Sequence, residues 1–223
     1  MTGPRVLVRE MGNEREPVAI IDDFAADPDA LLAFAAMQQY APAGRHYPGI
    51  KASLPDDYLR RQSPLIATIL RDVFGVTAVA SVLEARFSIV TTPPISLSIA
   101  QRLPHVDALE PGRLALIHYL VPGGTDGTAF YRHRATGFET VNAIRGPAYF
   151  AALRHEIESA PLPDAYIAAD TPLFERTGHV DGAYNRALLY RSRVLHSGAI
   201  APDAIRSSDP TKGRLTVTGF FAA

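Results

Sequence analysis

The tripeptide His-Val-Asp occurs twice in the sequence, at His105–Asp107 and at His179–Asp181. Side chains two positions apart on a β-strand point to the same face, so either triplet can direct an imidazole and a carboxylate at one metal ion. A third ligand is then needed, and His196 lies in a short apolar stretch, SRVLHSGAI. Two histidines and one carboxylate leave coordination positions open, an arrangement suited to non-haem Fe(II).

The first triplet fits such a site better than the second. His105 and Asp107 follow the stretch ISLSIAQRLP, which alternates like a strand and would direct both side chains into the mouth of a barrel. Only one turn and one strand separate the second triplet from His196, and ligands on facing sheets usually need more chain between them. Asp181 is also followed by glycine, a pair typical of a hairpin turn. We therefore expect the first triplet and His196 to bind the metal, and the second triplet to form a solvated turn.

Two further residues that could take part in chemistry lie near the C-terminus, in the stretch GRLTVTGFF. Arg214 and Thr216 share one face of this expected strand. A guanidinium inside a barrel needs a carboxylate partner, because an unpaired buried charge is costly, and arginine binds carboxylates through two parallel hydrogen bonds. A ligand can supply that partner. 2-Oxoglutarate has a carboxylate at the end away from its metal-chelating keto acid.

The composition limits the class of protein. The chain has 223 residues, enough for one domain with a sizeable core. Its formal net charge of -1 argues against a dominant attraction to nucleic acid or anionic membranes. It has no cysteine, so any metal must be held by imidazole and carboxylate groups. The N-terminus lacks the apolar core of a signal peptide, and no apolar run approaches the roughly 20 residues of a membrane span. A cytoplasmic location is expected.

Helices are expected in the first third of the chain. The stretch PVAIIDDF predicts a strand. Asp27 is a good N-cap for the helix that follows it, with proline at the first helical position. A second helix is expected to have Ser63 as its N-cap and Pro64 in its first turn, and to end at Gly75.

From about residue 78 the apolar pattern changes to a period of two, which is typical of strands. The expected strands are VLEARFSIV, ISLSIAQRL, RLALIHYLV, GTAFYRH, PLFERTGHV, NRALLYRS, VLHSGAI and GRLTVTGFF, and one helix, PAYFAALRHEIESA, interrupts them. This order predicts a mainly β fold with flanking helices (α+β), a sandwich or barrel. We expect a single domain over residues 1–223: an extension at 1–16, helical support at 17–77 and a barrel core at 78–223.

The ordered motifs PHVD, IHYLVPGGTDGTAF, NRALLYRSRVLHSG and GRLTVTGFF resemble those of the Fe(II)/2-oxoglutarate-dependent dioxygenases, most closely the prolyl-4-hydroxylase-like branch. The resemblance covers roughly residues 17–221, with the motifs in the second half. It implies a double-stranded β-helix (jelly-roll, cupin-like) barrel with the N-terminal helices packed on one sheet. It also implies that the first triplet and His196 bind iron, and that Arg214 binds the distal carboxylate of 2-oxoglutarate with Thr216 and Tyr119.

The chain departs from the family at one point. The segment between His196 and Arg214 is longer than usual, so Arg191 and Arg193 stay open as substitutes for the cosubstrate-binding arginine.

The implied reaction hydroxylates an unactivated C–H of an amino acid, peptide or small metabolite, with succinate and CO2 as co-products. Two alternatives are a non-catalytic double-stranded β-helix binding protein and a cupin-like metalloenzyme that does not use 2-oxoglutarate. Exposed edge strands favour a homodimer, and neither nucleic acid nor membrane is an expected partner.

Four further features can be interpreted from the sequence. The loop GRHYPGI is a plain connection or a lid over the substrate, and Arg132–Arg134 is a solvated strand end or a basic edge that anchors substrate. The glycines of Gly123–Thr128 indicate a hairpin turn, since no helix or lysine follows them as a phosphate-binding loop requires. His118 should point away from Tyr119, to the surface or to a position behind the site.

Overall fold

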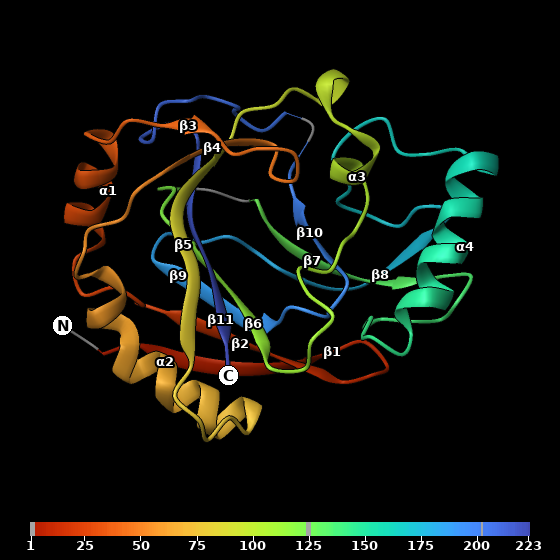
Figure 1. Ribbon diagram of the computed structural model, residues 1–223. Helices are drawn as coiled ribbons and strands as arrows, with labels where there is room; N and C mark the ends of the chain where they lie inside the picture. The colour runs from red at the N-terminus through yellow and green to blue at the C-terminus, as the bar shows by residue number, and fades with distance from the viewer. Residues whose placement is uncertain (1–2, 124–125, 202) are drawn as a thin grey trace.

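The computed structural model describes residues 3–123, 126–201 and 203–223. It consists of two antiparallel sheets and several helices (Figure 1). The large sheet has the order β1 (Arg5–Met11), β2 (Glu16–Asp22), β9 (Arg186–Arg191), β6 (Arg113–Tyr119), β11 (Arg214–Ala222), β5 (Ser81–Val90), β4 (Gly49–Ala52), β3 (Ala41–Pro42). The small sheet has the order β10 (His196–Ala199), β7 (Gly127–His133), β8 (Phe174–Val180). The helices are α1 (Pro28–Ala36), α2 (Tyr58–Phe74), α3 (Ile99–Arg102) and α4 (Gly146–Ser159), with a 3-10 turn at Pro94–Ser96.

Side chains alternate between the two faces of each strand, and the apolar core therefore forms three clusters. On β2, Val18 and Ile20 pack into the cluster between the two sheets. Their neighbours Ala19 and Ile21 pack into the cluster that α1 and α2 cover. A third cluster lies between the small sheet and α4, around Tyr131. Helices α1 and α2 thus lie on the outer face of the large sheet and α4 on that of the small sheet (Figure 1).

The mainly β architecture with flanking helices is confirmed. After β5 the chain moves between the sheets several times, because β6, β9 and β11 belong to the large sheet while β7, β8 and β10 belong to the small one. In the described residues no strand pairs one sheet with the other, so the two sheets face each other without closing into a hydrogen-bonded barrel.

The first helix begins as expected, since the Asp27 side chain accepts a hydrogen bond of 2.9 Å from the Ala30 backbone. The expected start of the second helix is wrong. Helix α2 begins at Tyr58, and Pro64 lies inside it. Proline cannot donate to the carbonyl one turn earlier, and Ser63 Oγ donates to that carbonyl, on Arg60, over 2.9 Å instead. The helix ends at Gly75 with φ 70°, as the sequence predicts.

Three other expectations are corrected. The stretch expected as a strand at 95–103 forms the 3-10 turn and α3, because adjacent prolines begin the turn and a capping box of Ser98 and Gln101 begins the helix. The expected N-terminal extension contains β1, which pairs with β2 from Arg5 opposite Asp22 to Met11 opposite Glu16. Residues 49 and 50, at the end of the stretch GRHYPGI that is expected as a loop, begin β4.

None of the helices in the described part of the chain combines the length and apolar character needed to cross a membrane. The hairpin turn expected at 123–128 includes residues 124 and 125, which lie outside the described residues.

Candidate functional site

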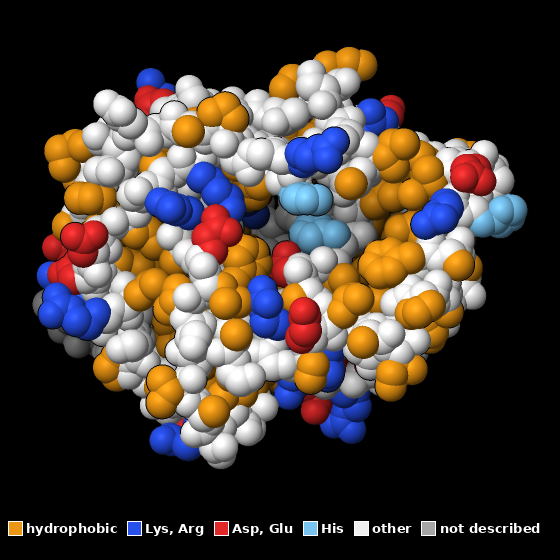
Figure 2. Space-filling model, viewed as in Figure 1, with side chains coloured by type: hydrophobic (Ala, Val, Ile, Leu, Met, Phe, Trp, Pro, Cys, Tyr) orange, Lys and Arg blue, Asp and Glu red, His pale blue; other side chains and the backbone are white. Residues whose placement is uncertain are grey.

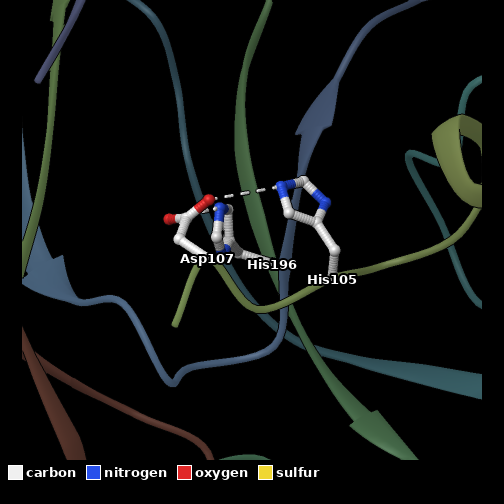
Figure 3. Close-up of side chains that lie close together, drawn as sticks. All are labelled: His105, Asp107 and His196. Atoms are coloured by element: carbon white, nitrogen blue, oxygen red, sulfur yellow. Dashed lines mark ion pairs between the residues drawn. The ribbon is translucent and has the colours of Figure 1, made fainter. Parts of the chain in front are cut away.

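His105, Asp107 and His196 converge at one end of the small sheet (Figure 3). One ligand atom from each of the three lies within 4.8 Å of the others. The convergence is built by the backbone: the N–H of each histidine donates to the carbonyl of the other, over 2.9 and 3.0 Å. This isolated antiparallel bridge extends the small sheet by one residue beside β10 and brings the two imidazole rings to 4.5 Å between centroids.

The Asp107 carboxylate faces both imidazoles. Its Oδ1 lies 3.7 Å from His105 Nε2, and its Oδ2 lies 3.5 Å from His196 Nε2. The Asp107 N–H donates to the Ser192 carbonyl over 2.8 Å and holds the backbone in place. Oδ2 is buried and has no hydrogen-bond partner among the described residues. A buried carboxylate oxygen without a donor is costly, and a cation between the three side chains would satisfy it.

The His196 imidazole is oriented as metal ligands usually are. His196 Nδ1 lies 2.9 Å from the Val194 carbonyl, so its N–H donates there and Nε2 is left to face Asp107. Desolvation lowers the pKa of His105 and the adjacent His196 lowers that pKa further, although the side chain is 52 % exposed and Asp107 acts in the opposite direction. The two lowering effects favour the neutral imidazole that binds metal. The donor set and its orientation therefore fit a divalent transition metal.

Arg214 lies on β11, on the side of the strand that faces the small sheet. Its Nη2 donates to the Gly127 carbonyl over 3.1 Å, and its guanidinium carbon lies 5.6 Å from the centre of the Tyr119 ring. Its Nε is buried without a hydrogen-bond partner, and no carboxylate in the described part of the chain forms an ion pair with Arg214. The guanidinium is thus available to an anionic ligand.

Tyr119 and Thr216 lie near this guanidinium but are already engaged. The Tyr119 hydroxyl is 2.7 Å from Thr128 Oγ1, and Thr216 Oγ1 donates to the Ser88 carbonyl over 3.3 Å. The other two candidate arginines differ from Arg214. Arg191 and Arg193 both form ion pairs with Glu16, at 2.9 and 2.8 Å. Their charge is balanced by the protein itself, which favours Arg214 as the arginine that meets a ligand.

The second triplet is not part of the cluster. His179 lies within β8 opposite Ala129, so the expected turn is wrong for this residue. Asp181 follows the strand with its side chain 76 % exposed, as expected of a solvated position, and forms an ion pair of 3.3 Å with His179.

His118 points away from Tyr119, as expected, but the alternative that places it at the surface is wrong. His118 is fully buried on the outer face of the large sheet, between Tyr58 and Asn185. The side chains of Arg132–Arg134 form ion pairs within the protein; His133 is buried, whereas Arg134 is exposed, as expected of a solvated strand end. Arg132 pairs with Glu139 and Glu175, His133 with Glu156, and Arg134 with Asp170 and Glu175.

Sequence reasoning missed two aromatic residues of the site. The ring of Tyr190 packs edge-on against His196, with centroids 4.9 Å apart. The hydroxyl of Tyr47 is buried near Arg214. Tyr47 belongs to the loop GRHYPGI, where an aromatic residue among glycines and prolines was the available signal. Figure 2 shows histidine side chains beside a hollow in this face, with basic side chains on one side and apolar ones on the other.

Solved structures with a similar fold include HygX from Streptomyces hygroscopicus with nickel, 2-oxoglutarate and hygromycin B bound. It is 11 % identical, the match covers 92 % of this chain and 82 % of that one, and the TM-score is 0.50. An N-substituted L-amino acid dioxygenase from Burkholderia ambifaria AMMD is 10 % identical over 99 % of this chain and 95 % of that one, with a TM-score of 0.43. At such identities the likeness concerns the fold alone.

No curated protein matches the sequence. The model of a family of unknown function, DUF6445, matches residues 2–221. The match spans nearly the whole chain, both sheets and all three converging side chains, and the protein therefore belongs to the DUF6445 family.

Proposed function

We propose that this protein is an Fe(II)- and 2-oxoglutarate-dependent dioxygenase. The observation that carries the proposal is the convergence of His105, Asp107 and His196, whose ligand atoms lie within 4.8 Å of one another. Two imidazoles and one carboxylate form the facial set typical of non-haem Fe(II). The buried and unpartnered Oδ2 of Asp107 supports a cation at this position. HygX, which has a similar fold, holds nickel and 2-oxoglutarate in its solved structure.

In this proposal Arg214 binds the distal carboxylate of 2-oxoglutarate through its guanidinium fork, and Thr216 and Tyr119 line the same pocket. Bound Fe(II), 2-oxoglutarate and O2 together supply the oxidising power to hydroxylate an unactivated C–H, with succinate and CO2 as co-products. The protein favours the neutral imidazole of His105, directs His196 Nε2 at Asp107, orients the cosubstrate from Arg214 and encloses the pocket between the two sheets.

The finer assignments belong to the same proposal. The alternation of strands between the sheets supports a double-stranded β-helix. The order of the motifs supports the prolyl-4-hydroxylase-like branch. The substrate is an amino acid, a peptide or a small metabolite. We also propose a cytoplasmic protein that forms a homodimer through its edge strands.

An anaerobic titration of the apo-protein with Fe(II) and then 2-oxoglutarate tests the proposal. The chelated complex gives a weak visible charge-transfer band. We expect the band in the wild type and in His179→Ala, which carries the matched second triplet, and no band in His105→Ala. A band that survives in His105→Ala would contradict the ligand assignment. No band in any protein would favour a binding protein without catalytic iron.

A further inference from the structure

Two buried hydrogen-bond donors near the proposed cosubstrate pocket have no acceptor. The Tyr47 hydroxyl and the Arg214 Nε are both buried without a hydrogen-bond partner among the residues that the structure describes. The two groups are close enough for the Arg214 charge to act on the pKa of Tyr47, which burial raises. Tyr47 therefore keeps its proton at neutral pH. Buried donors without acceptors are costly, and in a binding site they indicate an absent ligand.

The other hydroxyls beside Tyr47 are already engaged. Ser88 Oγ lies 2.7 Å from Thr218 Oγ1, and Thr216 Oγ1 donates to the Ser88 carbonyl. Tyr119 is bonded to Thr128. Thr216 and Ser88 lie close enough to the Tyr47 hydroxyl to lower its pKa, but no hydrogen bond of normal geometry joins them to it. Tyr47 is thus a better donor to a new ligand than the hydroxyls on β5, β6 and β11.

The backbone next to Tyr47 is hydrogen-bonded to the end of β5 and to the residues that follow it. The Pro48 carbonyl accepts hydrogen bonds of 3.2 Å from both Thr91 and Thr92. Gly49 pairs with Val90, and a Cβ at Gly49 would lie 1.9 Å from the Ile89 carbonyl oxygen, so only glycine permits this close approach. The loop GRHYPGI, expected as a connection or a lid, therefore holds Tyr47 firmly at the pocket.

The missing ligand must be an acceptor with negative charge. A phenol donor and a guanidinium that meet no carboxylate of the protein are complementary to a carboxylate. We infer that Tyr47 is a specificity-determining residue, whose hydroxyl donates to the same distal carboxylate as Arg214 and so selects a 2-oxo dicarboxylate over a 2-oxo monocarboxylate. The inference rests on the proposed function.

The test compares two cosubstrates in the metal-loaded protein under anaerobic conditions. 2-Oxoglutarate carries the distal carboxylate, and 2-oxopentanoate has the same carbon chain without it. Tyr47→Phe removes only the hydroxyl. Tyr40→Phe is the matched control, because its hydroxyl is also buried and unpartnered but belongs to the chain segment before β3. Affinity is read from the charge-transfer band, and circular dichroism checks the fold.

We expect Tyr47→Phe to weaken 2-oxoglutarate binding about tenfold or more and to leave 2-oxopentanoate binding unchanged. Tyr40→Phe should change neither. Unaltered 2-oxoglutarate affinity in Tyr47→Phe, or an equal loss for both oxo acids, would overturn the inference and leave the proposed function standing. A wild-type protein that binds metal but not 2-oxoglutarate would overturn both.

Discussion

His118 Nε2 and Asn185 Oδ1 lie 3.0 Å apart inside the protein, beneath α2. The same amide accepts from the Ala25 N–H over 2.8 Å and donates to the Ala25 carbonyl over 2.9 Å. Since Oδ1 is the acceptor, His118 Nε2 carries a proton, and Nδ1 accepts from the Tyr58 hydroxyl at 3.0 Å. One neutral histidine thus joins β6 to α2 and to the segments before α1 and β9.

This network predicts loss of stability in mild acid. Burial lowers the pKa of His118 to about 4, below the ordinary value of about 6.5, although the Asn185 hydrogen bond opposes the shift. The unfolded chain therefore binds the proton first. The stabilisation is complete above about pH 6.5 and falls as the pH decreases toward 4, by on the order of 3 kcal/mol.

Urea unfolding at pH 7.5 and pH 4.5 measures this effect. His118→Gln should show a smaller decrease in the free energy of unfolding between the two pH values than the wild type. His155→Gln, at an exposed position on α4, should behave as the wild type does. The same pH slope in His118→Gln and wild type would disprove the assignment.

Asp107 should be a source of instability until a metal binds. Its buried Oδ2 has no donor, so Asp107→Ala is expected to keep or raise the melting temperature of the apo-protein. Ni(II), at about 100 times its Kd, should stabilise the wild type by about 2.7 kcal/mol, which for a chain of this size is a rise of roughly 5–10 °C in Tm. Differential scanning fluorimetry should show this rise in His179→Ala and not in Asp107→Ala. A full rise in Asp107→Ala would contradict the site.

Substitutions of Arg214 and of Arg191 should have different effects, the first on 2-oxoglutarate affinity and the second on the free energy of unfolding. Arg214→Gln should weaken 2-oxoglutarate binding by roughly ten- to a hundredfold and leave Ni(II) stabilisation unchanged. Arg191→Gln loses an ion pair to Glu16 and should lower the free energy of unfolding without changing 2-oxoglutarate affinity. Calorimetry of the metal-loaded proteins measures both affinities. If Arg191→Gln alone lost 2-oxoglutarate, the two roles would have to be exchanged.

Gly49 should matter for both stability and cosubstrate binding. Gly49→Ala places a methyl group against the Ile89 carbonyl and is expected to destabilise the protein by about 1–3 kcal/mol. It should also weaken 2-oxoglutarate binding, because the displaced segment carries Tyr47. Gly3→Ala meets no atom within 4 Å and serves as the control in urea unfolding and in binding. Unchanged stability in Gly49→Ala would show that the close approach is relieved at no cost.

The sequence predicted the strands of the second half well, because they are short runs rich in β-branched or aromatic residues between turn residues. Strands β6, β7 and β9 are buried on both faces, so their apolar runs are nearly continuous. The prediction failed at 95–103, where an alternating apolar run lies after adjacent prolines and before a capping box. It also failed at β1, whose residues are exposed along almost the whole strand and so carry no burial pattern.

The site could be predicted where residue type alone limits the chemistry. His105, Asp107 and His196 come together as the sequence indicated, although their role as ligands stays a prediction. Tyr47 and the burial of His118 could not be predicted. Both depend on which distant segments pack against them, β5 in one case and α2 in the other, and no local pattern encodes that pairing.

The reciprocal backbone hydrogen bonds between His105 and His196 also bear on folding. They join the middle of the chain to a segment near its C-terminal end, so they close a very long loop. Contacts of such long range form late and slowly, because loop-closure entropy must be overcome first. A nascent chain that ends before β10 lacks one of the three clustered side chains. Acquisition of metal would thus report that the chain has been synthesised and folded at least as far as β10.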